Sequence, residues 1–167
     1  VVAIFGSPRA GGNSDALLDC AIKGAEAGGA EVKKIVIRDL QIAPCNSCGG
    51  CFENGVCVIH DDMQQIYPHF VDADGIIVAS PIYFMGVSSQ LKALIDRCQA
   101  FWARKYILHL PARGGARTAT GFLIATAAQS AGEEVFTGAV KTIKAFFHVL
   151  DTKYVGDLLC AGLEEKG

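Results

Sequence analysis

The stretch VVAIFGSPRAGGNS, residues 1–14, decides the fold that this chain is expected to adopt. Residues 1–5 form a continuous apolar run, which is typical of a buried strand in a parallel sheet. A glycine-rich turn follows directly, and a helical pattern begins at Ser14. Such a turn presents backbone N–H groups at the positive end of a helix dipole. The stretch therefore predicts the first strand and helix of an α/β fold, with an anion site between them.

The rest of the chain repeats this alternation of strands and helices. We expect further strands at residues 31–37, 75–79, 121–125 and 153–159, and helices at residues 14–27, 61–70, 88–102 and 133–150. Asp61 or Asp62 and Ser88 or Ser89 are suitable N-terminal caps for two of these helices. Residues 104–118 have no clear period and are expected to form a loop. Five strands alternating with four helices predict one α/β domain over residues 1–167, with a parallel sheet covered on both faces.

Composition excludes several classes of protein. The 15 Lys and Arg residues against 17 Asp and Glu residues give a net charge of −2, so no basic surface for nucleic acid is expected. Hydrophobic residues make up 51% of the chain and charged residues 19%, which indicates a large buried core rather than disorder. No apolar run reaches the roughly 18 residues that a membrane helix needs, so no membrane partner is predicted.

Cysteine is unusually frequent, with seven in 167 residues. The odd number, spread over a chain of this size, indicates a reducing and therefore cytoplasmic setting rather than a disulfide scaffold. Cys20 and Cys98 lie on apolar helical stripes, so both are predicted to be buried core residues. Cys160 gives no functional signal.

The other four cysteines fall in the window CNSCGGCFENGVC, residues 45–57, with the spacing C-x2-C-x2-C-x5-C. A loop that contains Gly49 and Gly50 lets such thiolates converge on one centre, as iron–sulfur and structural zinc sites require. Zinc sites usually pair two C-x2-C units across a longer span, so the compact run favours a [4Fe–4S] cluster. Zinc and free or disulfide-forming thiols remain alternatives. The predicted ligands are Cys45, Cys48, Cys51 and Cys57.

The turn at residues 6–14 lacks the features of the commoner phosphate loops. Gly12 stands where a nucleoside triphosphatase has lysine, and Pro8 stands where a dinucleotide fold has its second glycine. What remains are two hydroxyls, one amide and one guanidinium, which suit a phosphate monoester bound without metal. An ordinary strand-to-helix turn is the alternative, although such turns are usually shorter.

Together, GSPRAGGNS at residues 6–14 and SPIYFMGVSSQLKALIDR at residues 80–97 resemble the flavodoxin-like NADPH-dependent FMN reductases. The resemblance spans essentially the whole chain. It implies a three-layer sandwich whose five-stranded parallel sheet has the order 2-1-3-4-5. It also implies that the first loop holds the FMN phosphate, that the second wraps the isoalloxazine, and that a third touches the ring edge. The residues so implied are Ser7, Arg9, Asn13, Ser14, Pro81, Ile82, Tyr83, Phe84, Met85, Gly86, Thr126, Ala127 and Ala128.

The physical interpretation of these loops agrees with the resemblance. In a sheet of this order a crevice opens between strands one and three, which are the strands that end in the first two loops. Tyr83, Phe84 and Met85 offer flat apolar surface to a tricyclic ring. Packing in the core or in a dimer is the alternative for this aromatic cluster.

Within this family, the cysteine spacing resembles that of the iron–sulfur flavoproteins, which bind [4Fe–4S] beside FMN. The resemblance implies an FMN-dependent oxidoreductase with ferredoxin or NAD(P)H as donor and a quinone or oxygen species as acceptor. It implies a homodimer or homotetramer in which the cluster of one subunit lies near the FMN of another. Phe101, Trp102 and Tyr106 are candidate interface aromatics, with packing in the core or in a loop as the alternative.

No residue pair indicates acid–base or nucleophilic catalysis, so no catalytic side chain is assigned. Two other functions remain open. One is an NAD(P)H-dependent FMN or quinone reductase without a cluster. The other is a non-enzymatic flavodoxin-like carrier or thiol redox sensor.

Overall fold

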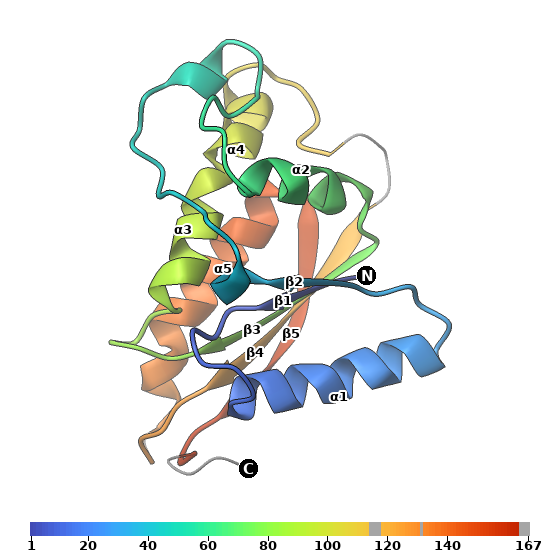
Figure 1. The fold of residues 1–167 in the computed structure, drawn as a ribbon, viewed down its shortest axis with the longest axis vertical. Coiled ribbons are helices and arrows are strands. Elements are labelled where there is room, and N and C mark those ends of the chain that lie inside the picture. The colour runs from blue at the N-terminus through green and yellow to red at the C-terminus, as the bar shows by residue number, and fades with distance from the viewer. Residues whose placement is uncertain (114–117, 131, 164–167) are drawn as a thin grey trace.

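The computed structural model describes residues 1–113, 118–130 and 132–163. Five parallel strands form one sheet in the order β2-β1-β3-β4-β5, which confirms the flavodoxin-like order (Figure 1). The strands are β1 (Val2–Phe5), β2 (Lys33–Val36), β3 (Gly75–Pro81), β4 (Ala119–Thr126) and β5 (Thr152–Cys160). All four residues of β1 are buried, as a strand inside a parallel sheet with covered faces requires.

Helices lie on both faces of the sheet. One face is covered by α1 (Asn13–Ala27), whose Leu18 and Ile22 pack against Phe5. The other face is covered by α2 (Met63–Asp72), α3 (Ser89–Arg97), α4 (Gln99–Tyr106) and α5 (Thr137–Val149) (Figure 1). The larger core therefore lies on the side of the sheet that faces α2 to α5. None of the helices in the described part of the chain has the length and hydropathy needed to span a bilayer.

The single helix predicted over residues 88–102 is two helices. Ser88 caps α3, because its Oγ accepts a hydrogen bond from Leu91 N at 3.2 Å. Cys98 then leaves helical geometry with ψ near 5° and starts α4. No glycine or proline marks this break in the sequence. The second helix extends to Tyr106, so the loop predicted at residues 104–118 begins three residues late, and residues 114–117 of that prediction lie outside the described residues.

One prediction about a single side chain in a helix is wrong. Cys20 is exposed, because it lies about 200° around α1 from the buried Leu18. Phe101 is buried against Tyr67 and Phe70 and therefore belongs to the core rather than to an interface surface. The prediction for Cys98 is confirmed, since this thiol is buried.

Candidate functional site

The first and second loops meet at the carboxyl ends of β1 and β3, which are adjacent strands. A cavity of about 230 Å³ opens there. It is lined by most of the residues predicted to contact FMN, namely Ser7, Arg9, Asn13, Ser14, Pro81, Ile82, Tyr83, Thr126, Ala127 and Ala128. Gly12 and Leu163 complete the lining. No local pattern in the sequence marks Leu163, which reaches the cavity because its N–H donates to Ala127 O at 3.0 Å.

Backbone atoms and buried hydroxyls hold the two loops together. Gly6 N donates to Ala79 O at 2.8 Å, and a Cβ at Gly6 would lie 2.6 Å from that same oxygen. Ser88 Oγ donates to Gly6 O at 2.5 Å, while Ser88 N donates to Ser80 Oγ at 3.1 Å. Glycine is therefore required where the first loop leaves β1, since any side chain would separate β1 from β3.

A buried carboxylate shapes the first loop. Asp15 Oδ2 accepts a hydrogen bond from Gly11 N at 3.0 Å and forms an ion pair with Arg38 Nη1 at 3.0 Å. Ser7 Oγ accepts from Arg9 N and donates to Arg9 O, so this hydroxyl fixes the turn rather than pointing outward. No side chain caps the first turn of α1, whose N-cap is Gly12, and a phosphate would find N–H groups there. The ion pair of Asp15 and Arg38 was not predicted, because the two residues belong to different elements and no local pattern links them.

The second loop forms a tight hairpin at its tip. Tyr83 and Gly86 exchange backbone hydrogen bonds of 2.9 Å, and Phe84 and Met85 between them have positive φ angles of 48° and 63°. Such angles in non-glycine residues cost on the order of 1 kcal/mol each and occur where surrounding structure enforces them. Met85 O accepts from Ala139 N at 3.0 Å, which fixes the hairpin to α5.

This geometry separates the predicted ring-contacting residues into two groups. Pro81, Ile82 and Tyr83 line the cavity, whereas Phe84, Met85 and Gly86 do not. The Phe84 side chain is fully exposed, at 107% of its reference accessibility. Within the isolated chain, the second loop therefore brings only its first half to the cavity.

The four clustered cysteines line one small cavity of about 40 Å³, next to the start of α4. Cys48 is exposed and the other three are half-buried. Cys51 Sγ lies 3.8 Å from Gln99 O. No group of three or more His, Cys, Asp or Glu side chains among the described residues is close enough to hold a metal ion in this conformation. The donor set nevertheless suits iron–sulfur or zinc chemistry, because four thiols share one cavity.

The thiols of this loop have different electrostatic surroundings. Burial raises the pKa of Cys51, and the neighbouring Cys57, Cys45 and Cys48 thiols add to this effect. Burial also raises the pKa of Cys57, but the polar groups beside it, namely the Ile59 backbone, the Tyr67 hydroxyl and the Arg97 guanidinium, outweigh burial and leave that pKa lowered. Cys57 is therefore the thiol of the loop whose thiolate this surrounding favours.

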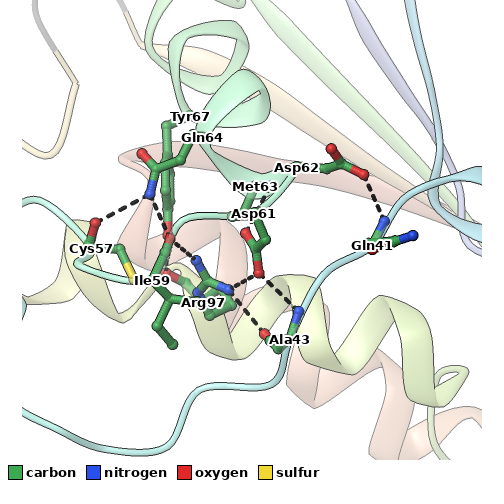
Figure 2. A network of polar contacts seen from close by, with 10 residues as sticks. All are labelled: Gln41, Ala43, Cys57, Ile59, Asp61, Asp62, Met63, Gln64, Tyr67 and Arg97. Atoms are coloured by element: carbon green, nitrogen blue, oxygen red, sulfur yellow. Dashed lines mark hydrogen bonds and ion pairs between the residues drawn. The ribbon is translucent and has the colours of Figure 1, made fainter.

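A polar network centred on Arg97 lies beside Cys57 (Figure 2). Arg97 forms an ion pair with Asp61 at 2.5 Å. Met63 N, at the start of α2, donates to Asp61 Oδ1 at 3.0 Å, whereas the N-cap residue is Asp62, which forms no side-chain capping bond. Asp62 instead accepts from Gln41 N at 2.7 Å. Helix capping was the role predicted for the two aspartates, and no local pattern in the sequence marks Arg97 as a partner of Asp61.

Comparison with known proteins agrees with this geometry. The family model for NADPH-dependent FMN reductases matches residues 1–156. An iron–sulfur flavoprotein of Methanosarcina thermophila is 34% identical over 94% of this chain and 77% of its own length. An iron–sulfur flavoprotein of Methanocaldococcus jannaschii is 36% identical over 94% of this chain and 76% of its own length.

A solved structure of similar fold is the NAD(P)H:quinone oxidoreductase from Methanothermobacter marburgensis, with a TM-score of 0.71 and 14% identity. That match covers 97% of this chain and 84% of the other. At this identity it supports the fold alone. Both the family model and the two sequence relatives span nearly the whole chain, and so the protein belongs to the NADPH-dependent FMN reductase family and is an FMN-dependent oxidoreductase.

Proposed function

We propose that this protein is an iron–sulfur flavoprotein that moves electrons between a [4Fe–4S] cluster and FMN. The observation that carries the proposal is the position of four cysteine thiols around one cavity, in a chain whose relatives bear that name. The cavity at the ends of β1 and β3 would hold FMN. Cys45, Cys48, Cys51 and Cys57 would hold the cluster.

The chain's own residues bind and orient these groups. When bound, FMN supplies two-electron chemistry and the cluster supplies single-electron transfer. Arg9 and the uncapped N-terminus of α1 would neutralise the FMN phosphate, with Asn13 and Ser14 beside it. Thr126 and Ala127 line the far side of the same cavity, and Tyr83 offers a flat apolar surface to the ring.

The relative position of the two sites bears on the assembly. The cysteine loop lies at the upper end of the molecule in Figure 1, whereas the first loop lies in its lower half. We therefore retain the prediction of a homodimer or homotetramer in which the cluster of one subunit approaches the FMN of another. Trp102 and Tyr106 remain at the surface for such a contact. Ferredoxin or NAD(P)H is the proposed donor, a quinone or oxygen species the acceptor, and the cytoplasm the setting.

An absorption spectrum of protein purified without oxygen, with iron and sulfide assays, tests this function. We expect flavin bands, a broad shoulder that bleaches on reduction, and about four iron and four sulfide per chain. Flavin bands without iron would instead establish a cluster-free NAD(P)H-dependent reductase. That second candidate is favoured by one observation, namely that the described thiols do not stand at metal-binding distances.

Turnover then separates an enzyme from a carrier. Steady-state oxidation of NAD(P)H or reduced ferredoxin with a quinone should be catalytic. A protein that exchanges electrons once and does not turn over with either donor would be a flavodoxin-like carrier instead.

A further inference from the structure

We infer that Arg97 is a positioning residue for the cysteine centre: its guanidinium ties down the chain on both sides of the loop and brings an unpaired N–H to the cavity that the cysteines line. The inference rests on the proposed function, because it concerns the cluster that the loop would hold. It assigns a role to a residue of α3, which lies outside the cysteine window.

The first observation is that one side chain bonds both ends of the loop. Arg97 Nη1 donates to Ala43 O at 3.0 Å, two residues before Cys45. Arg97 Nη2 donates to Ile59 O at 3.1 Å, two residues after Cys57. Apart from the short turn at Gly50–Phe52, the described loop has no regular secondary structure to hold it. The guanidinium thus holds the two ends of the cysteine loop together, as a strand pair or a helix would otherwise do.

The second observation is that Asp61 reinforces the same closure (Figure 2). Asp61 Oδ2 accepts from Arg97 Nη1 at 2.5 Å and from Ala43 N at 2.9 Å. The Arg97 side chain has no solvent exposure, so its charge needs this partner inside the protein. Ala43 is therefore bonded through its N–H to Asp61 and through its carbonyl to Arg97.

The third observation is an unused donor. Arg97 Nε is buried and has no hydrogen-bond partner among the described residues. Buried donors are nearly always paired, so an unpaired one indicates that an acceptor is to be supplied. Arg97 lines the cavity that the four cysteines share. A sulfur of Cys57 or of the cluster is the acceptor that this cavity would present.

These contacts predict two separable effects on the cluster. Residues that orient metal ligands typically change metal affinity by about 10- to 100-fold when they are removed. Hydrogen bonds and positive charge near cluster sulfurs raise the reduction potential. Loss of Arg97 should therefore lower cluster retention and move the midpoint potential to more negative values, whereas FMN binding should not change.

The test compares Arg97→Lys and Arg97→Gln with the wild type and with a matched control, Arg113→Lys. Arg113 is also buried, donates to Val71 O and Ala73 O, and has an Nη1 without a partner among the described residues, but it does not line the cysteine cavity. Each protein is reconstituted with iron and sulfide without oxygen. The measurements are iron, sulfide and FMN per chain, resistance of the cluster to a chelator, the midpoint potential followed by electron paramagnetic resonance, and the melting temperature.

We expect Arg97→Gln to lose its cluster to chelator about tenfold faster than the wild type and to have a more negative midpoint potential. Arg97→Lys keeps the positive charge but cannot bond both ends of the loop. Relative to Arg97→Gln, it should therefore recover the wild-type midpoint potential more fully than the wild-type cluster retention. Arg113→Lys should lose thermal stability yet match the wild type in both cluster properties.

Two outcomes would overturn the inference, and they are distinguishable. If the wild type holds a cluster and the Arg97 variants match Arg113→Lys in retention and potential, Arg97 is merely structural and the proposed function stands. If the wild type binds neither iron nor sulfide under these conditions, the proposed function fails and the inference fails with it.

Discussion

The first loop and the cysteine loop follow neighbouring strands, β1 and β2, but different parts of the chain hold them. The first loop is shaped by groups at the strand and helix ends around it, such as the Gly6–Ala79 hydrogen bond and the Asp15 carboxylate near the start of α1. The cysteine loop instead depends on Arg97 and Asp61, two side chains from α3 and the start of α2. The first loop is therefore held by the strands and helices of the fold itself, whereas the cysteine loop is held by a specific buried ion pair in addition.

The largest expected effect is on the cysteine loop alone. Cys51→Ala should remove the cluster completely, because this half-buried thiol lines the shared cavity, while FMN content stays at the wild-type level. Iron, sulfide and flavin assays on the same sample measure both. Cys20→Ala is the control, since that exposed thiol lies on α1 and should change neither cofactor. Equal loss of FMN in Cys51→Ala would show that the two sites are not independent.

Asp61→Asn is expected to have the next largest effect, about 3 kcal/mol of unfolding free energy at neutral pH, because it leaves the buried Arg97 charge uncompensated. Denaturant unfolding measures this loss. Lys92→Ala is the control, because its ion pair with Asp96 is exposed and should be worth less than about 1 kcal/mol.

The pH dependence of the same pair has a definite sign. Burial alone would raise the pKa of Asp61, but hydrogen bonds from Arg97, Ala43 and Met63 hold it below its ordinary value of 3.8. A lowered carboxyl pKa contributes stability that is complete above the ordinary value and is lost as the pH falls through the folded-state value. Wild-type stability should therefore fall more steeply than that of Asp61→Asn below about pH 4. If the stabilities of the wild type and of Asp61→Asn fell equally steeply with pH, the lowered pKa of Asp61 would not be the cause.

Gly6→Ala tests the first loop and should cost about 2 kcal/mol, because the added methyl group meets a backbone oxygen that cannot move independently of the sheet. FMN affinity should fall with it, whereas cluster content should not. Gly24→Ala is a matched control within α1: nothing lies within 4 Å of its added methyl group, so it should raise stability by about 0.5 kcal/mol or more. Denaturant unfolding and FMN titration distinguish the two variants.

The smallest expected effect is at the tip of the second loop. Phe84→Ala should change the unfolding free energy by less than about 0.5 kcal/mol, since the side chain is fully exposed. Tyr83→Ala, one residue earlier, lines the cavity and should weaken FMN binding. If Phe84→Ala lost as much FMN affinity as Tyr83→Ala, the tip of the second loop would have to contact the isoalloxazine ring.

The sequence predicts well what depends on neighbours in the chain. The apolar run of β1, the turn after it and the order of strands were all predicted, because period and turn composition are local signals. The spacing of the four cysteines predicted that their thiols converge on one centre; they line one cavity, but the described thiols do not stand at metal-binding distances. That cavity is smaller than the one at the ends of β1 and β3, and spacing contains no information about cavity size.

What the sequence did not reveal depends on residues far apart in the chain. Arg97 and Asp61 are separated by 36 positions, and nothing local in either segment distinguishes a buried ion pair from a solvated one. The break at Cys98 has no glycine or proline to mark it, and the exposure of Cys20 depends on which face of α1 meets the sheet. Such features follow from packing, which periodicity determines only in part.

The length of α3 has a consequence for both sites. Its cap, Ser88, bonds Gly6 at the first loop, and its last residue, Arg97, bonds the cysteine loop. One inserted residue between them would rotate one end against the other by about 100° and shift it by about 1.5 Å. Either Ser88 would leave Gly6 or Arg97 would turn from Ala43 and Ile59. The nine residues of α3 therefore fix the orientation of the first loop relative to the cysteine loop, and a single insertion would misalign one of the two loops without disturbing the sheet.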